Sequence, residues 1–314
     1  MIKIGIDAMG GDFAPNAIVE GAVLATEHLS PEAKIVLIGK QPVIEAILKN
    51  SNYSGTSIEV VHADEVVEMG EHPTKALSQK PNSSISIGFK LLKEKTIDIF
   101  CSAGNTGAMH VGALFSIKAI EGISRPCIAG FVPQTNGEYA IMLDIGANAD
   151  CKPEMLEQFG VIGSIFAKSA FNLEHSPRVA LMNIGEEEQK GSLIAQNAHQ
   201  LLKANRKINF VGNIEGSDMF TNAADVIVTD GFTGNALFKL GESLYEIAKS
   251  KGIEDEFIGR TNYESIGGSP IIGVNGNVMI AHGKSSANAI KNMVSWAQKQ
   301  AETNAYLQIA NALK

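Results

Sequence analysis

Three segments of the sequence place small polar residues and glycines directly after an apolar strand pattern. The clearest is segment 228–235, VTDGFTGN, which combines turn and helix-cap residues before a helical pattern. The same arrangement recurs over residues 98–108 and 142–150. Open α/β sheets bind ligands where a strand ends at a helix N-terminus, and exposed N–H groups there favour anions. We therefore expect the three turns to form one anion-binding cleft.

Two further segments have residues that suit an anionic substrate. Residues 7–12, DAMGGD, follow the first strand, and the paired glycines let backbone N–H groups approach a ligand. The spacing is not G-x-G-x-x-G, so it predicts no nicotinamide dinucleotide site. Residues 72–84 contain two lysines before Ser83, a residue type that caps helices. Helix capping and a grip on phosphate or pantetheine both remain open for this segment.

The sequence shows no activated nucleophile of its own. Ser102 lacks the G-x-S-x-G elbow, and Cys101 lies in an apolar strand pattern, where a thiol is buried. Asp144 and Asp150 share one turn, but no histidine or third carboxylate accompanies them there, so metal ligation is only weakly indicated. We expect neither a metal nor a cofactor.

Lys190 follows three consecutive glutamates in the segment 183–191, NIGEEEQKG. Such an acidic run is usually a solvated loop or the first turn of a helix. The lysine could instead meet a developing negative charge, and the residues alone do not decide between these roles.

The bulk composition narrows the class of protein. The chain has 314 residues, 45% of them apolar, which supports a sizeable core. With 26 basic and 34 acidic residues its net charge is −8, which disfavours a nucleic-acid-binding protein. The three cysteines lack C-x-x-C spacing and indicate reduced cytosolic thiols. We expect neither a signal peptide nor a membrane-spanning helix.

Strand and helix patterns alternate along the chain, which predicts a mostly parallel sheet covered by helices in a single α/β domain over 1–314 with room for two sublobes. An N-G turn near residue 275 predicts a hairpin that joins 271–274 to 278–281. Strands are expected at 2–6, 34–38, 57–61, 97–100, 128–132, 139–144, 179–183, 208–211 and 226–229. Helices are expected at 14–28, 43–49, 83–92, 106–117, 153–168, 192–204, 236–249 and 287–313.

Taken together, the motifs resemble the phosphate acyltransferase family PlsX. The resemblance rests on IGIDAMGGD at 4–12, SAGNTGA at 102–108, GAN with CKP at 146–153, NIGEE with KG at 183–191, TDGFTGN at 229–235 and GVNG at 273–276. It implies a Rossmann-like three-layer α/β/α fold related to phosphotransacetylases and to isocitrate and isopropylmalate dehydrogenases. It also implies transfer of a long acyl group from acyl carrier protein to inorganic phosphate, an early step of phospholipid synthesis.

The resemblance implies site residues and partners as well. Lys190 and Asn235 become the catalytic candidates, one for phosphate and one for the thioester oxygen in either order. The resemblance also implies a cytosolic homodimer that binds transiently to the membrane surface. A membrane acyltransferase would receive the acyl phosphate there. The residues assigned to substrate binding are Asp7, Gly10, Gly11, Asp12, His72, Lys75, Lys80, Ser83, Gly104, Asn105, Thr106, Gly107, Gly146, Ala147, Asn148, Asp230, Gly231, Thr233 and Gly234.

Two departures from the family pattern and three alternatives stand beside this prediction. Ser78 occupies a position where the family often has a basic residue, and segment 247–269 is polar for a membrane contact. A phosphotransacetylase acting on acyl-coenzyme A would use nearly the same chemistry. A metal-dependent 2-hydroxyacid dehydrogenase lacks support from the carboxylates. A non-catalytic protein that binds acyl carrier protein or lipid would bind without turnover.

Overall fold

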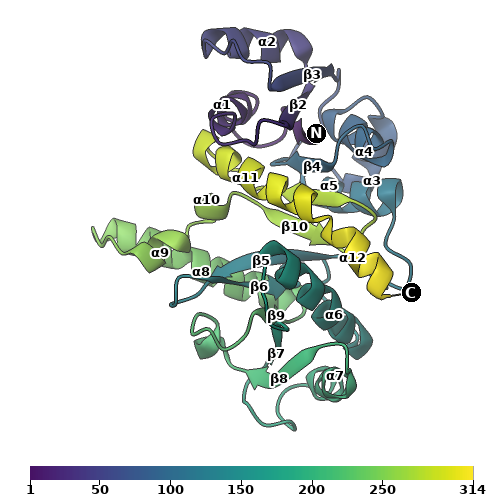
Figure 1. Ribbon diagram of the computed structural model, residues 1–314, viewed down its shortest axis with the longest axis vertical. Helices are drawn as coiled ribbons and strands as arrows, with labels where there is room; N and C mark the ends of the chain where they lie inside the picture. Colours follow the sequence, from purple (N-terminus) through teal and green to yellow (C-terminus); the bar gives the residue numbers. More distant parts are fainter. Residues whose placement is uncertain (314) are drawn as a thin grey trace. The chain divides into compact units, whose positions relative to one another are not determined.

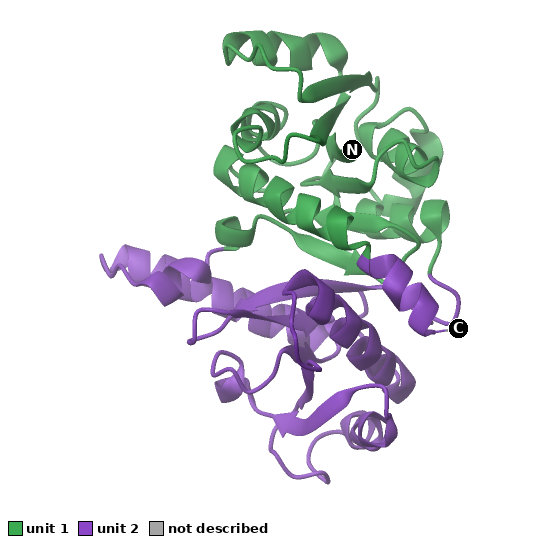
Figure 2. Ribbon diagram, in the orientation of Figure 1, with its two compact units in different colours: residues 1–119, 263–304 green, residues 120–262, 305–314 purple. Residues whose placement is uncertain are grey.

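The computed structural model describes residues 1–313, which divide into two compact α/β units (Figure 2). Unit 1 contains residues 1–119 and 263–304. Unit 2 contains residues 120–262 and the chain from Ala305 onward. Each unit therefore brings together stretches of chain that are far apart in the sequence.

The strands of unit 1 lie in the order β3-β2-β1-β4-β11-β10 (Figure 1). Neighbouring strands are parallel except β10 and β11, which form the predicted antiparallel hairpin. The strands are β1 (Ile2–Asp7), β2 (Ala33–Gly39), β3 (Ile58–His62), β4 (Ile99–Ser102), β10 (Ser269–Ile272) and β11 (Asn277–Ile280). The helices are α1 (Asn16–Ala25), α2 (Gln41–Asn50), α3 (Pro73–Gln79), α4 (Ser84–Lys93), α5 (Thr106–Gly112) with a π-helix (Ala113–Ile117), α10 (Tyr263–Ile266) and α11 (Ala287–Thr303).

Alternating side chains of β4 show that helices cover both faces of the unit 1 sheet. Ile99 and Cys101 are fully buried in a cluster with residues of α1 and α11. Phe100 points to the other face, where its ring centre lies 5.1 Å from that of Phe89 on α4 in an edge-to-face pair. The predicted three-layer α/β/α arrangement is confirmed.

The strands of unit 2 lie in the order β5-β6-β9-β7-β8. β5 is antiparallel to β6, and the other pairs are parallel. The strands are β5 (Cys127–Pro133), β6 (Tyr139–Leu143), β7 (Arg178–Met182), β8 (Asn209–Ile214) and β9 (Val226–Val228). The helices are α6 (Pro153–Ala170), α7 (Leu193–Ala204), α8 (Gly231–Ser250), α9 (Glu256–Arg260) and α12 (Ala305–Ala312), with a 3₁₀ turn (Gly216–Asp218).

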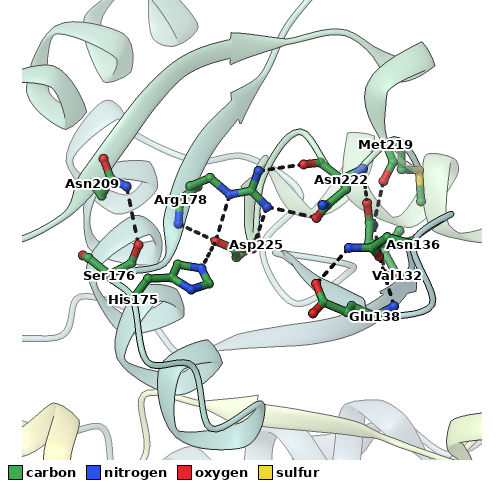
Figure 3. A network of polar contacts seen from close by, with 11 residues as sticks. Val132, Asn136, Glu138, His175, Ser176, Arg178, Asn209, Met219, Asn222 and Asp225 are labelled. Carbon is green, nitrogen blue, oxygen red and sulfur yellow. Dashed lines mark hydrogen bonds and ion pairs between the residues drawn. The ribbon is translucent and has the colours of Figure 1, made fainter.

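A charged network joins the amino ends of β7 and β9 (Figure 3). The Asp225 carboxylate accepts hydrogen bonds from the Arg178 backbone N–H at 2.7 Å and from its guanidinium Nη2 at 2.9 Å. His175 Nε2 lies 3.2 Å from the same carboxylate. Burial alone would raise the pKa of Asp225, but the hydrogen bonds and charge of Arg178 outweigh it and hold that pKa below its ordinary value. The network holds β7 and β9 together at their amino ends, whereas the motifs follow their carboxyl ends.

The predicted strands are all confirmed, with ends shifted by at most a few residues. The predicted helix at 106–117 continues as a π-helix from Ala113. Three short helices, α3, α9 and α10, were not predicted. They have seven, five and four residues, too few for an apolar period to show in the sequence.

The predicted single helix over 287–313 is wrong. Asn304 adopts a left-handed backbone with φ of 47° and separates α11 from α12. Asparagine tolerates this conformation better than most residues, which makes it a common helix terminator. α11 then belongs to unit 1, and α12 packs on α6 in unit 2.

Candidate active site

Three motif-bearing turns leave the same edge of the unit 2 sheet. β9 pairs in parallel with β6 on one side and with β7 on the other, with Val228 beside both Leu143 and Leu181. The turn at 144–150, the turn at 229–235 and the loop at 183–192 therefore start next to one another. Carboxyl ends of parallel strands are where such sheets bind ligands.

The turn after β6 is organised by a buried carboxylate. Asp144 is fully buried and accepts hydrogen bonds from the backbone N–H groups of Gly146 at 3.2 Å, Ala147 at 3.1 Å and Asn148 at 2.6 Å. The backbone N–H of Ile128 and the side-chain amide of Asn148 also donate to it. Asp144 thus holds the turn in shape. The N–H groups that the sequence suggested for an anion are already used by this protein side chain.

The turn after β9 is joined to the turn after β6 by backbone contacts. Gly231 N–H donates to the carbonyl of Asn148 at 2.7 Å. A side chain at Gly234 would collide with the carbonyl oxygen of Asp144, so only glycine allows this approach. The two turns form one rigid floor at the edge of the sheet.

α8 begins at this floor, with Asp230 as its N-cap. Asp230 accepts from the Thr233 backbone N–H and from its hydroxyl, both at 2.8 Å. The carboxylate occupies the helix N-terminus that the sequence suggested for an anion. Asn235 lies one turn further and is exposed. Its side-chain Nδ2 donates to the Ile145 carbonyl at 3.0 Å, which leaves one of its two N–H groups free.

The loop that carries Lys190 is held by side-chain amides. Gln196 Nε2 donates to the carbonyls of Gln189 at 2.8 Å and Gly191 at 3.1 Å. Asn183 Nδ2 donates to the carbonyl of Lys190 at 3.1 Å, and Asn213 Nδ2 donates to that of Glu187 at 3.0 Å. The loop is therefore fixed from α7, from β8 and by its own first residue.

Gly191 lets the chain turn back toward α7 with φ of +89°, where a Cβ would collide with the Asn183 side chain. The Lys190 side chain itself is exposed and makes no hydrogen bond or ion pair with any residue in 1–313. The acidic residue Glu188 turns away from it and pairs with Lys203, which lowers the pKa of Glu188. A fixed backbone thus carries a free ammonium group.

In unit 1, the turns after β1 and β4 meet through a buried hydrogen bond. The two strands are parallel neighbours, with Ile6 beside Cys101. Ser102 Oγ donates to the Asp7 carboxylate at 2.7 Å and accepts from Gly104 N–H at 2.9 Å. Burial raises the pKa of Asp7, although its hydrogen bonds act in the opposite direction. Gly10 packs directly against Gly104.

Asn105 holds a neighbouring segment of unit 1 in place. Its Oδ1 caps α5 by accepting from Ala108 N–H at 2.9 Å, and its Nδ2 donates to the carbonyls of Glu68, Met69 and Glu71. All these contacts are internal, so Asn105 has a structural role here. Its substrate-binding role stays a prediction.

Among the remaining unit 1 candidates, some side chains are bonded within the protein and others are exposed. Lys80 donates to the Val66 carbonyl at 2.7 Å and pairs with Glu71 at 2.7 Å. Ser83 is the N-cap of α4 and accepts from Ser86 N–H at 3.3 Å. The other predicted substrate-binding residues here that are exposed are Asp12, His72, Lys75 and Thr106; Gly11 and Gly107 are half-buried. Their substrate-binding roles stay predictions.

Cys101, Cys127 and Cys151 are free thiols, and all three are buried. Burial raises the pKa of Cys101 and of Cys127, and it raises that of Cys151 to about 11. A neutral buried thiol is a poor nucleophile. Within residues 1–313 no group of three or more His, Cys, Asp and Glu side chains is arranged to hold a metal ion. No helix in that range is long and apolar enough to cross a membrane.

The sequence did not identify Gln196 and Asn213, the amides that hold the Lys190 loop. They lie on α7 and β8, outside every motif, and their partners are backbone carbonyls. An acceptor of that kind leaves no residue pattern in the sequence, so only the fold reveals the contact.

The fold of this chain is similar to that of phosphotransacetylases. A phosphotransacetylase from Streptococcus pyogenes has a TM-score of 0.69 at 18% identity, covering 96% of this chain and 94% of its own. The EutD phosphotransacetylase from Staphylococcus aureus has a TM-score of 0.64 at 17% identity over 96% and 94% of the two chains. At such identities the likeness concerns the fold alone.

Closer relatives identify the family. Residues 2–308 match the family described as fatty acid synthesis protein. The phosphate acyltransferase of Dictyoglomus turgidum is 42% identical over 331 aligned residues, covering 99% of this chain and 98% of the relative. That of Pelotomaculum thermopropionicum is 43% identical over 336 aligned residues, covering 100% and 95%. The chain belongs to the fatty acid synthesis protein family, and the resemblance to PlsX seen in the motifs is confirmed.

Proposed function

We propose that this protein transfers a long-chain acyl group from acyl carrier protein to inorganic phosphate, forming acyl phosphate for phospholipid synthesis. Family membership supports the reaction class, because relatives at 42% and 43% identity are named phosphate acyltransferase. The fold supports it too, since phosphotransacetylases share it over 96% of this chain.

One observation carries the assignment of residues to this reaction. The backbone N–H groups of Gly146, Ala147 and Asn148 all donate to Asp144, and the N-terminus of α8 is capped by Asp230. Binding of negative charge at this edge therefore falls to side chains. The free ammonium of Lys190 and the free N–H of Asn235 come from neighbouring turns and suit that role.

The proposed reaction needs no protein nucleophile. A phosphate oxygen attacks the thioester carbonyl carbon, forming a C–O bond and a tetrahedral oxyanion. The oxyanion collapses, the C–S bond breaks, and the thiolate leaves and takes a proton from water, giving the free carrier thiol. Lys190 and Asn235 orient phosphate and stabilise the oxyanion, one group for each task. The neutral, buried thiols of Cys101 and Cys127 favour this direct attack over an acyl-enzyme.

Trapping of acyl phosphate with hydroxylamine tests the proposal. Long-chain acyl carrier protein with phosphate should give acyl hydroxamate, and the matched acyl-coenzyme A should give far less. Lys190→Ala and Asn235→Ala should each lower kcat about 10²–10³-fold, the usual cost of one preorganised donor. Lys168→Ala removes another exposed lysine, on α6 in the same unit, and serves as the control.

Each other outcome has a defined meaning. Equal use of acyl-coenzyme A would favour the phosphotransacetylase alternative. Binding of acyl carrier protein without hydroxamate would favour a non-catalytic binding protein. A burst of acyl-enzyme, or loss of turnover with EDTA that a divalent ion restores, would contradict direct metal-free attack. Near-normal kcat in both site variants would remove Lys190 and Asn235 from the mechanism.

The family resemblance also supports a cytoplasmic homodimer that works at the membrane surface and passes its product to a membrane acyltransferase. Exposed apolar side chains support the membrane part of this proposal: Leu240 and Ile247 on α8 are 64% and 52% exposed, and Ile253 after it is 51% exposed. Phe257, in contrast, makes an edge-to-face contact with Phe220, with ring centres 5.6 Å apart, and is only half-exposed. We therefore assign the apolar contact to Ile247 and Ile253.

A further inference from the structure

Unit 2 contains a cavity of about 610 Å³ beside the candidate catalytic turns. Its walls come from β7, α6, the start of α7 and the start of α8. Small-molecule pockets in proteins typically enclose about 300–1,000 Å³, so this cavity is large enough for a ligand of substantial size.

The walls of the cavity are mainly apolar. Leu156 and Leu181 line it and are almost fully buried. Three large apolar side chains that also line it are exposed: Ile184 by 79%, Phe232 by 73% and Ile194 by 46%. Exposed apolar side chains are normal when scattered, but here they gather around one cavity. The cavity thus offers apolar contact from its interior to its outer rim.

The polar groups of the lining are mostly engaged within the protein. Asp230 and Thr233 bond to each other, and Ser192 Oγ accepts from the Ala195 N–H at 3.2 Å. The thiol of Cys151 has its pKa raised to about 11 by burial and is neutral at physiological pH. No lysine or arginine is among the described residues that line the cavity. A lining without basic side chains does not suit phosphate, and its one exposed carboxylate, Asp150, would repel it.

We propose that this cavity binds the hydrocarbon chain of the acyl donor and of the acyl phosphate product. The proposal rests on the proposed function, because it adds the chain-binding part of the same site. Gly191 lines the cavity and directly follows Lys190 in the loop. A chain lying in the cavity would therefore leave its carbonyl head group at the loop that carries the free ammonium.

Binding of alkylphosphonates tests the cavity without requiring turnover. These probes combine a phosphate-like head with an alkyl chain, and calorimetry below their micelle-forming concentrations would compare octyl to hexadecyl members. Affinity should rise about fourfold for each methylene that enters the cavity. Absence of any dependence on chain length in the wild-type protein would overturn the proposal.

A matched pair of variants on α7 locates the chain. Ala195 lines the cavity next to Gly191, at the end where the head group would lie, so Ala195→Phe should weaken both hexadecylphosphonate and octylphosphonate about tenfold or more, the equivalent of two methylenes. Ala204→Phe makes the same substitution at an exposed position of α7 outside the cavity and should bind both probes normally. Ala195→Leu is a smaller filling substitution for use if Ala195→Phe does not fold. Identical behaviour of the Ala195 and Ala204 variants would contradict the proposal.

Two further readouts separate this inference from its neighbours. Weakening of phosphopantetheine binding by Ala195→Phe, with the alkyl series unaffected, would assign the cavity to the carrier-protein arm and overturn the proposal. Chain-dependent binding without hydroxamate formation would refute the proposed function and leave the cavity as an acyl-chain site. Normal turnover with undiminished alkylphosphonate binding in Ala195→Phe would refute the cavity alone.

Discussion

Gln196 should determine how firmly Lys190 is presented to substrate. Its Nε2 donates to the carbonyls of Gln189 at 2.8 Å and Gly191 at 3.1 Å, the residues on either side of Lys190. Gln196→Ala removes both hydrogen bonds and leaves the lysine in place. We expect kcat/KM for phosphate transfer to fall about tenfold with little change in Tm, because the loop is exposed and contributes little to the core.

The expected magnitude follows from the two lost hydrogen bonds. Each contributes about 0.5–1.5 kcal/mol net, so the pair orders the loop by about 1–3 kcal/mol. Water can replace Gln196 at these carbonyls because the loop is exposed, which places the loss in the lower half of that range. A loss near 1.4 kcal/mol is a factor of ten. This is smaller than the effect expected for removing Lys190 itself.

Two matched variants and a double-mutant cycle check the reasoning by hydroxamate assay. Gln200 lies one turn further on α7 and reaches only the Glu188 side chain at 3.5 Å, so Gln200→Ala should be nearly normal. Gln196→Glu keeps the length but loses the donor, and it should be no better than Gln196→Ala. In a Lys190→Ala background, Gln196→Ala should have no further effect. An additive effect there, or equal effects at Gln196 and Gln200, would refute the positioning role.

Three other predictions concern stability, docking and the membrane. Asp225→Asn should cost about 2 kcal/mol of unfolding free energy at neutral pH by removing charge-assisted hydrogen bonds. Because the pKa of Asp225 is lowered in the folded protein, its contribution to stability is complete above the unfolded pKa of about 3.9 and is lost as pH falls toward the folded value. The unfolding free energies of wild type and variant, measured by chemical denaturation, should therefore converge at low pH. A difference that stays constant with pH would contradict this. Lys90 and Lys93 are exposed in the last turn of α4, and we propose that they dock the acidic carrier protein. Lys90→Glu with Lys93→Glu should then raise KM for carrier protein several-fold at low salt and leave KM for phosphate unchanged; no change in either constant would exclude this contact. We expect the wild-type protein to float with liposomes and the double variant Ile247→Glu with Ile253→Glu not to. Equal flotation of the two proteins would exclude Ile247 and Ile253 as the membrane contact.

The sequence was sufficient for the arrangement of strands and for the places where motifs leave them. Strand patterns and turn residues are local, so the apolar run before Thr229 and the N-G hairpin near residue 275 could be read directly. The break of the C-terminal helix at Asn304 could not, because asparagine is also found within helices. What decides it is the packing of α11 and α12 in different units.

The sequence could not predict which side chains of the site already form hydrogen bonds or ion pairs within the protein. Lys80 looked as suitable for an anion as Lys190, since both are lysines in polar segments. The fold pairs Lys80 with Glu71 and the Val66 carbonyl. Lys190 has no such partner within residues 1–313, and Glu188 in the same loop pairs with Lys203 on α7. Which lysine stays free depends on contacts between segments, and no spacing rule contains that information.

These internal hydrogen bonds also change the physical account of anion binding at the carboxyl ends of the unit 2 strands. The glycine turns suggested that backbone N–H groups would hold the phosphate, yet Asp144 and Asp230 already accept from most of them. The carboxylates at these positions, of which Asp144 is buried and Asp230 half-buried, would repel a phosphate that relied on the same donors. In this arrangement the turns serve as a rigid support, and positive charge must come from a side chain that the support holds in place. A fixed Lys190 loop beside Asn235 meets that requirement, which is why loosening the loop through Gln196 should lower turnover although every group that would touch substrate remains.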